Sequence, residues 1–316
     1  MVDVFAKCRL PETYQFVKDL GVYPYYQAIE ERPGGGEVVI DGRVLVQAGS
    51  NDYLGLSGDE RVKEAAVEAT RRLGTGSGGS RLSNGPLALH EELEARLAGF
   101  LGRAAVMVTS AGYLANLALE ALIGPGDTVI GDRLVHACLI DAVRLGAVDL
   151  PTITFSKALG TLGGAVAGPE EIIAYLRHYA RSMVFTAALS PACAAAALAA
   201  LEIIATEPER RHRLRTAAER LSRELAAMGY AVVPSDRPVI AVPVGDDLRC
   251  FQLWRELFDE GVFTTAMISP GVPPGQALIR VSITAAHTEA QLERVVAAFA
   301  AAGRRLRGVY GCAAGS

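Results

Sequence analysis

The residue whose surroundings most clearly suggest chemistry is a lysine that directly follows a short apolar strand. Lys157 ends the run TITFSK, and the glycine-rich turn ALGTLGG comes next. Packing explains such a lysine poorly, because an ammonium group is rarely buried without a partner. A desolvated amine attacks carbonyl groups and can afterwards act as a base. The same residues would also suit a solvated loop lysine, so both interpretations stand at this point.

A second candidate is the run SAGY, residues 110–113, where a predicted strand ends and a predicted helix begins. Backbone amides at the start of a helix bind anions, and glycine lets an anion approach the backbone closely. Gly112 and Tyr113 would therefore face an anion. A plain helix cap by Ser110 is the alternative, and the two interpretations are compatible.

Arg280 is the third candidate, because it interrupts the otherwise apolar strand LIRVSI. A guanidinium group in such a strand needs a planar anion, and a substrate carboxylate would bind to it through two hydrogen bonds. A structural salt bridge is the alternative for this arginine.

One glycine pattern does not indicate a binding site. Gly74, Gly76 and Gly79 spell G-x-G-x-x-G, the fingerprint of dinucleotide-binding proteins. These glycines follow a predicted helix and do not join a strand to a helix, which argues against a Rossmann site.

The elements that would position these residues follow from hydrophobic periodicity. Val62, Ala66, Ala69 and Leu73 recur at helical spacing and predict a helix that begins after Asp59. Further along, the strands AAVMVT, TVIG and LPTITF are separated by helical segments. Such alternation predicts a parallel sheet with helices on both faces.

The flanking segments have a different pattern. EVVIDG and RVLVQAG predict an antiparallel pair in an N-terminal arm. A long charged helix, about 208 to 228, precedes the predicted strands YAVVP, VIAVPV, VFTTAM and LIRVSI, which two helices interrupt, as in an α+β domain. We therefore divide the chain into an arm (1–58), a large domain (59–207), a small domain (208–306) and a tail (307–316).

Composition restricts the classes of partner. The 316 residues are 50% hydrophobic and 21% charged, with a net charge of −4 and no block of like charge, which argues against nucleic-acid and membrane-surface partners. No stretch reaches the ~20 apolar residues of a membrane span, and the N-terminus lacks an export signal. The five cysteines are scattered and never spaced as C-x-x-C. We expect a cytoplasmic protein with reduced thiols and no metal.

A series of motifs extends over nearly the whole chain. In order, they are SNDYLGL (50–56), GTGSGGSR (74–81), SAGYLAN (110–116), DRLVHACLIDAVRL (132–145), TFSKALG (154–160) and IRVSITAAHT (279–288). In order and style these motifs resemble the α-oxoamine synthases, fold-type-I pyridoxal-phosphate (PLP) enzymes that include 8-amino-7-oxononanoate synthase, serine palmitoyltransferase and glycine C-acetyltransferase. The resemblance implies an α/β fold, the PLP-transferase fold type I, with a shortened parallel sheet, an N-terminal arm and a C-terminal α+β domain.

The resemblance also implies a cofactor site for PLP. Lys157 matches the family's Schiff-base lysine, and His136 matches the histidine that stacks on the cofactor ring. Read alone, His136 could equally be a helix cap or a core residue. Thr154 matches a phosphate contact, although a plain strand threonine would look the same. The cofactor-binding residues predicted in this way are Ser110, Gly112, Tyr113, His136, Thr154, Lys157 and Thr186.

The implied substrates are an α-amino acid and an acyl-CoA, which the family condenses with loss of CO2. Asn51 and Arg280 match the residues that hold the amino-acid carboxylate, while Lys157 and His136 are the predicted catalytic pair. Thr186 matches a position that reaches the phosphate from the neighbouring subunit. The resemblance therefore implies a homodimeric acyltransferase.

The acyl donor depends on the N-terminal arm. Members of the biotin pathway tend to have an arginine before a Tyr-Pro pair, whereas Val22 precedes Tyr23 and Pro24 here. The segments LGVYPYYQAIE and YLRHYARSMVF are similar to bacterial serine palmitoyltransferases, which favours a plain long-chain acyl-CoA. The alternatives are 8-amino-7-oxononanoate synthase, a class I/II aminotransferase, and an impaired homologue that acts only as a binding or partner subunit.

One departure from the family lies between Ala147 and Val148. Family members have further strands here, and two βαβ units of roughly 30 residues each would fill the gap. The missing stretch would carry the aspartate that pairs with the pyridine nitrogen of PLP, so we expect severely reduced turnover. Asp149 cannot replace it, because the intervening strand residues place it roughly 17 Å from Lys157.

Overall fold

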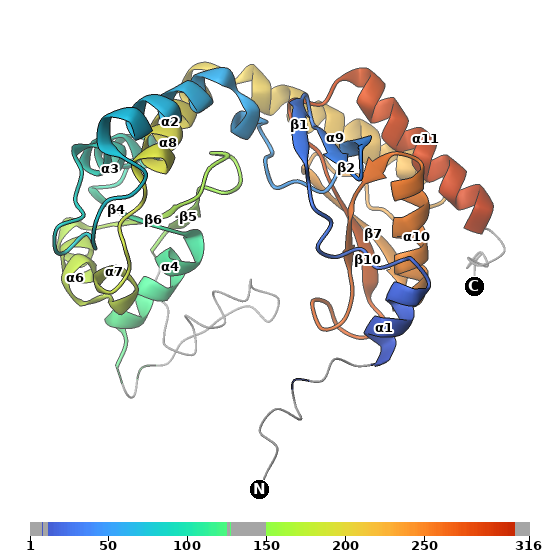
Figure 1. The fold of residues 1–316 in the computed structure, drawn as a ribbon, viewed down its shortest axis with the longest axis horizontal. Helices are drawn as coiled ribbons and strands as arrows, with labels where there is room; N and C mark the ends of the chain where they lie inside the picture. Colours follow the sequence, from blue (N-terminus) through green and yellow to red (C-terminus); the bar gives the residue numbers. More distant parts are fainter. Residues whose placement is uncertain (1–7, 9–11, 125–126, 128–149, 307–316) are drawn as a thin grey trace, which may run out of the picture. The chain divides into compact units, whose positions relative to one another are not determined.

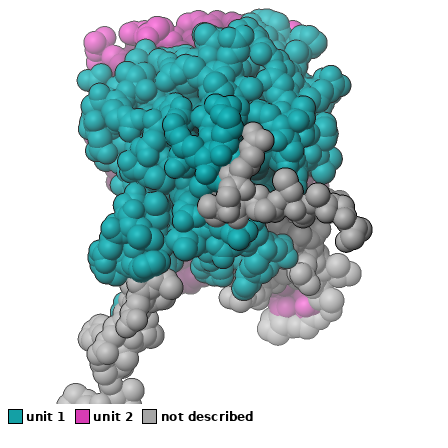
Figure 2. All heavy atoms as spheres, turned by 90° about the vertical axis from the view of Figure 1, so that its right-hand side faces the viewer, with its two compact units in different colours: residues 1–53, 209–316 teal, residues 54–208 magenta. Residues whose placement is uncertain are grey.

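The computed structural model describes Cys8, residues 12–124, Asp127 and residues 150–306 (Figure 1). The chain forms two compact units. Unit 1 combines Met1–Tyr53 with Glu209–Ser316, and unit 2 comprises Leu54–Pro208; Figure 2 colours them separately. The N-terminal arm thus belongs with the C-terminal segment in one unit.

Unit 2 is built on a three-stranded sheet with the order β4-β6-β5. Strands β4 (Ala105–Thr109) and β5 (Thr152–Thr154) both pair antiparallel with β6 (Gly164–Gly168), and therefore run in the same direction on either side of it. The sequence analysis expected parallel neighbours and a glycine-rich turn at this point, and it missed β6. Glycine and alanine are weak strand formers, but these small residues let a helix approach the strand closely.

Helices cover both faces of this sheet. Helix α3 packs on β4 and against α8, which in turn packs on α2. The helix predicted after Asp59 is confirmed as α2, and Asp59 caps it, since its side chain accepts a hydrogen bond from the amide of Arg61. The helical elements of unit 2 are η2 (Leu56–Gly58), α2 (Glu60–Leu73), α3 (Ala88–Leu101), α4 (Gly112–Leu117), η3 (Ala118–Leu122), α6 (Glu170–Tyr179), α7 (Arg181–Val184) and α8 (Pro191–Thr206).

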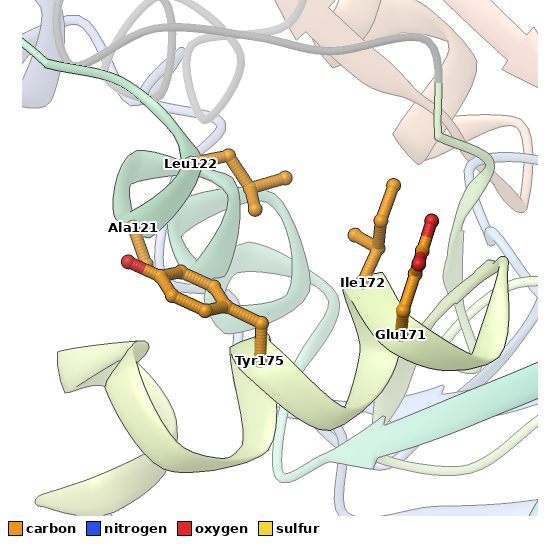
Figure 3. A pocket seen from close by; sticks show the side chains of 5 residues that line it. All are labelled: Ala121, Leu122, Glu171, Ile172 and Tyr175. Carbon is orange, nitrogen blue, oxygen red and sulfur yellow. The ribbon is translucent and has the colours of Figure 1, made fainter.

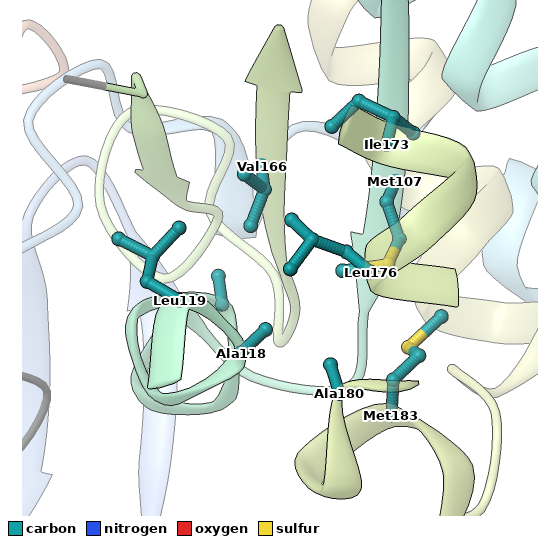
Figure 4. Close-up of a cluster of buried hydrophobic side chains, with 9 residues drawn as sticks. Met107, Ala118, Leu119, Val166, Ile173, Leu176, Ala180 and Met183 are labelled. Atoms are coloured by element: carbon teal, nitrogen blue, oxygen red, sulfur yellow. The ribbon is translucent and has the colours of Figure 1, made fainter. Parts of the chain in front are cut away.

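A buried apolar cluster holds α4, η3, α6 and α7 on one face of the sheet (Figure 4). Met107 of β4 lies opposite Val166 of β6, and both side chains are fully buried. Burial of each large side chain contributes about 1.5–3 kcal/mol. The other members of the cluster are Ala115, Ala118, Leu119, Ile173, Leu176, Ala180 and Met183.

Unit 1 contains two sheets, with the orders β1-β2-β3-β8 and β7-β10-β9. The predicted antiparallel pair of the arm is confirmed as β2 and β3, and β3 also pairs parallel with β8 from the C-terminal segment. The elements of unit 1 are α1 (Glu12–Asp19), β1 (Glu31–Gly34), β2 (Glu37–Ile40), β3 (Arg43–Gln47), α9 (Glu209–Ala227), β7 (Val239–Gly245), α10 (Asp247–Asp259), β8 (Val262–Phe263), β9 (Thr265–Met267), β10 (Ala277–Ser282) and α11 (Glu289–Leu306).

Two strand predictions in unit 1 are wrong. YAVVP forms no strand, because Ser235 just beyond it bonds instead to α9: its amide and its carbonyl oxygen each lie 3.0 Å from the hydroxyl of Ser222. VFTTAM divides into β8 and β9, which join different sheets. The break falls at Thr264, whose carbonyl accepts a 3.2 Å hydrogen bond from the indole of Trp254.

Within the part of the chain that the structure describes, no single helix is long and apolar enough to cross a membrane. Only α8 and α9 taken together meet the requirement, and they do so on length and composition alone.

Candidate functional site

The carboxyl ends of β4 and β5 lie level at one edge of the unit 2 sheet. Thr109, the last residue of β4, and Thr154, the last residue of β5, both stand opposite Gly164, the first residue of β6. The segments that follow β4 and β5 therefore leave the sheet at the same edge. Ligands of open α/β sheets bind outside the carboxyl ends of the strands, so this edge is a candidate site.

Gly112 begins α4 in direct contact with Thr154. A Cβ atom on Gly112 would lie 2.5 Å from both Cβ and Oγ1 of Thr154, and a Cβ atom on Gly164 would lie 2.6 Å from the Cα of Gly112. Only glycine at both positions permits this approach. The start of α4 therefore lies beside the Thr154 hydroxyl, which is 2.9 Å from the hydroxyl of Ser156.

Ser110 does not cap α4, so the capping alternative is wrong. The N-cap residue is Ala111, whereas the Ser110 hydroxyl donates a hydrogen bond to the carbonyl oxygen of Ala187. This bond brings the segment that carries Thr186 to the end of β4. The Thr186 side chain is half-buried, and Tyr113 on the first turn of α4 is 46% exposed.

Lys157 stands on a closed loop beyond β5. The Phe155 amide donates to the carbonyl of Gly163 at 2.9 Å, and the Gly160 amide donates to the carbonyl of Lys157 at 3.0 Å. Phe155 is fully buried, and a Cβ atom on Gly163 would lie 2.4 Å from its ring. The lysine side chain is half-buried and forms no hydrogen bond or ion pair with a described residue. The loop is thus fixed while the amine stays available for a ligand.

These groups fit the phosphate and the aldehyde of PLP. The phosphate needs several donors, and Gly112 lets the amides at the start of α4 lie directly beside Thr154, where a Cβ atom would clash. Hydroxyl groups of Thr154 and Ser156 lie at the same edge, and Lys157 follows directly. The arrangement can hold a phosphorylated aldehyde with its carbonyl carbon next to an amine.

Arg280 occupies the central strand of the β7-β10-β9 sheet in unit 1, opposite Ala241 and Thr265. Its neighbours Ile279 and Val281 are fully buried on one face of the strand, so the period of two directs the half-buried arginine to the other face.

The partners of Arg280 are neutral. Its Nη2 atom donates to Oδ1 of Asn51 at 2.7 Å and to the hydroxyl of Tyr53 at 3.3 Å. No carboxylate of the described residues pairs with it, so within them the salt-bridge alternative is wrong. Its Nη1 and Nε groups form no hydrogen bond with a described residue. These N–H groups therefore remain to donate hydrogen bonds to a carboxylate.

Sequence reasoning missed Tyr53. Two hydrogen bonds hold the turn that carries Tyr53. The Tyr53 amide donates to the carbonyl of Asn51 at 2.9 Å, and the Ala285 amide donates to the carbonyl of Tyr53 at 2.8 Å. The available signal was its place in SNDYLGL, two residues after Asn51. The turn adds a second neutral acceptor, the Tyr53 hydroxyl oxygen, beside Asn51.

His136 and the junction of Ala147 and Val148 lie outside the described residues. The stacking role of His136 and its proximity to Lys157 therefore stay predictions.

The sequence profile of the family described as aminotransferase class I and II matches residues 44–154 and 146–299. This chain belongs to that family. A putative 8-amino-7-oxononanoate synthase of Gloeobacter violaceus is 36% identical over 84% of this chain and 90% of its own length. The serine palmitoyltransferase of Bacteroides thetaiotaomicron is 32% identical over 92% of this chain and 95% of its own length.

Solved structures agree with these relatives. A structure of SPT with PLP superposes with a TM-score of 0.92 at 27% identity and covers 96% of this chain and 99% of that one. The Sphingomonas wittichii serine palmitoyltransferase gives a TM-score of 0.92 at 25% identity, with 98% and 100% covered. The predicted family, fold class and PLP dependence are confirmed.

The alignments also reveal how much of the relatives this chain lacks. The alignment with the Gloeobacter protein has 352 columns, whereas 84% of 316 residues is about 265, so about 87 columns hold no residue of this chain. The Bacteroides alignment, with 377 columns and 92% of this chain, gives about 86. The two profile matches meet at 146–154, where the sequence analysis located the missing stretch.

Proposed function

We propose that this chain is a PLP-dependent α-oxoamine synthase, a transferase that condenses an α-amino acid with an acyl-CoA and releases CO2 and CoA. The observation that carries the proposal is that β4 and β5 end side by side. Gly112 at the start of α4 lies beside Thr154 there, and Lys157 follows Thr154 by three residues. Membership of the family and the two named relatives support it.

In this proposal Lys157 binds the aldehyde of PLP and later moves a proton at the amino-acid Cα. Thr154, Ser110 and the amides of Gly112 and Tyr113 hold the phosphate, and His136 stacks on the ring. Bound PLP supplies an electron sink for the bond that is cleaved. The Lys157 amine has no described carboxylate partner that would have to be displaced first.

Arg280 and Asn51 bind the amino-acid carboxylate, and Tyr53 helps to fix the guanidinium plane. A fixed guanidinium fork sets the orientation of the carboxylate and hence of the Cα substituents. The two relatives differ in acyl donor by name, and we propose a plain long-chain acyl-CoA because Val22 precedes Tyr23 and Pro24. An assay that compares palmitoyl-CoA with an acyl-CoA that ends in a carboxylate tests this choice.

We also propose a cytoplasmic homodimer in which Thr186 contacts the phosphate bound by the other subunit. Turnover should be well below that of full-length relatives, because about 87 alignment columns of theirs have no counterpart here. A chain that binds PLP but never turns over would favour the alternative of a partner subunit. Light scattering at micromolar concentration tests the dimer.

The decisive experiment uses the low lysine content. The chain has four lysines, Lys7, Lys18, Lys63 and Lys157, so few amines compete for the aldehyde. After incubation with PLP and borohydride reduction, peptide mapping should find the pyridoxyl group on Lys157. Lys157→Ala should abolish the labelling. The matched control Lys63→Ala removes an exposed lysine that pairs with Glu60 and should leave it unchanged. Labelling of another lysine in the native protein would contradict the proposal.

A further inference from the structure

Among the described strands, β5 is paired on one side only. Its two ends bond to β6 and its continuation, since the Ala167 amide donates to the Pro151 carbonyl and the Phe155 amide donates to the Gly163 carbonyl, both at 2.9 Å. In an antiparallel pair the bonded residues alternate, so the peptide groups of Thr152 and Thr154 point away from β6. No described strand pairs with that side.

The residues of β5 are less buried than those of β6, which is paired on both sides. All five residues of β6, which has a strand on each side, are buried, whereas all three residues of β5 are only half-buried. A short strand whose outward peptide groups pair with no described strand is a template for another strand.

An apolar groove in the same unit accompanies the free edge. Ala121 and Leu122 of η3 face Ile172 and Tyr175 of α6 around a space of about 290 Å3, which Glu171 also lines (Figure 3). Ala121, Leu122, Ile172 and Leu150 are among the partly buried residues that pack against the buried cluster. Leu150 leads into β5, and a Cβ atom on Gly168 would lie 2.7 Å from its side chain. The apolar border of the core thus continues to the strand.

We propose that the free edge of β5 and this groove form an acceptor site for strands supplied by a separate polypeptide, one that corresponds to the roughly 87 columns found only in the relatives. The position of the missing stretch supports this occupant, because the two profile matches meet at 146–154, immediately before β5 and at its residues. In the relatives that stretch belongs to the same chain. Strand addition uses main-chain hydrogen bonds for affinity and apolar contacts for specificity.

The test measures binding and needs no activity. The full chain is titrated with a purified polypeptide that contains the corresponding stretch of the Gloeobacter protein, and association is followed by calorimetry and size-exclusion chromatography. A one-to-one complex is expected at micromolar concentration. Because PLP is absent from the titration, a failed proposal for the cofactor would not affect the result.

Three variants test the strand edge and the groove. Thr152→Pro removes one outward amide, leaves the β5–β6 bonds intact and should weaken binding about tenfold, while Thr152→Val keeps the amide and should change it less than about twofold. Tyr175→Glu alters only the exposed groove and should also weaken binding, which covers the case in which the proline variant misfolds. No complex, or equal binding by Thr152→Pro and Tyr175→Glu and the native chain, would overturn the proposal.

Discussion

Two arginines, one from each unit, show how the same side chain acquires different roles. Arg81 of unit 2 forms a bidentate pair with Glu94, at 3.0 and 3.2 Å, and both side chains are nearly buried. Arg280 of unit 1 has only the neutral oxygens of Asn51 and Tyr53. The charge of the first is neutralised within the fold, whereas that of the second meets no carboxylate among the described residues.

The surroundings of Glu94 strengthen this contrast. Its carboxylate also accepts hydrogen bonds from Arg177 at 2.7 Å and from the amide of Val108 in β4 at 2.9 Å. Arg81 belongs to the motif GTGSGGSR, so the structure gives that glycine-rich segment an anchoring role on α3 and β4. The Glu94 carboxylate thus has three hydrogen-bonding partners within unit 2, whereas Arg280 has only neutral partners among the described residues.

The largest effect is expected from Glu94→Gln. Removal of the charge leaves Arg81 and Arg177 near a neutral amide and should reduce the free energy of unfolding by about 3–5 kcal/mol. Urea denaturation followed by circular dichroism measures it. The matched control Glu92→Gln changes an exposed residue of the same helix and should stay within about 0.5 kcal/mol. Equal stability of the two variants would show that the Arg81–Glu94 pair does not stabilise the fold.

Arg280→Met should lower the affinity for the amino acid and leave the free energy of unfolding nearly unchanged. Loss of the guanidinium group should weaken amino-acid binding by about 2–4 kcal/mol, or roughly 30- to 1,000-fold, with little change in unfolding. The absorbance change of the PLP-loaded protein on titration with serine measures affinity. The control Arg304→Met removes an exposed arginine of α11 and should bind normally. Strong destabilisation by Arg280→Met, without loss of affinity, would make this arginine structural as well.

The smallest effect concerns one histidine in each unit, the buried His90 and the half-buried His287. Burial lowers the pKa of His287 to about 4 and also lowers the pKa of His90. Unfolding raises both pKa values, so the unfolded chain binds more protons below pH 6.5, and stability should fall as the pH decreases from 6.5 towards 4. His287 should contribute about 2–3 kcal/mol of this loss.

Urea unfolding at several pH values, for the native chain and His287→Gln, isolates that contribution. Nδ1 of His287 accepts a 3.2 Å hydrogen bond from the Thr284 amide, which glutamine can imitate without titrating near neutral pH. The variant should lose less stability between pH 6.5 and 4. Parallel profiles for the two proteins would show that His287 is not protonated differently on unfolding.

Prediction from sequence succeeded where the signal is local. The charged helix predicted at about 208–228 is α9 at Glu209–Ala227, and the helix predicted after Asp59 is α2. It failed for β6, since GAVAG contains few strand formers and is stabilised by pairing with β4 and β5. The helix cap by Ser110 was also wrong, because the carbonyl that its hydroxyl reaches belongs to residue 187.

The sequence by itself determined the family, the candidate lysine and the place of the missing stretch, because each is encoded in contiguous residues. Only the tertiary structure decided the partners: Arg280 lies beside Asn51, 229 residues away along the chain, and Arg81 pairs with a glutamate on the following helix. It also decided that β5 is paired on one side only among the described strands. Such features depend on strand register and packing between distant segments, which short-range sequence patterns do not specify.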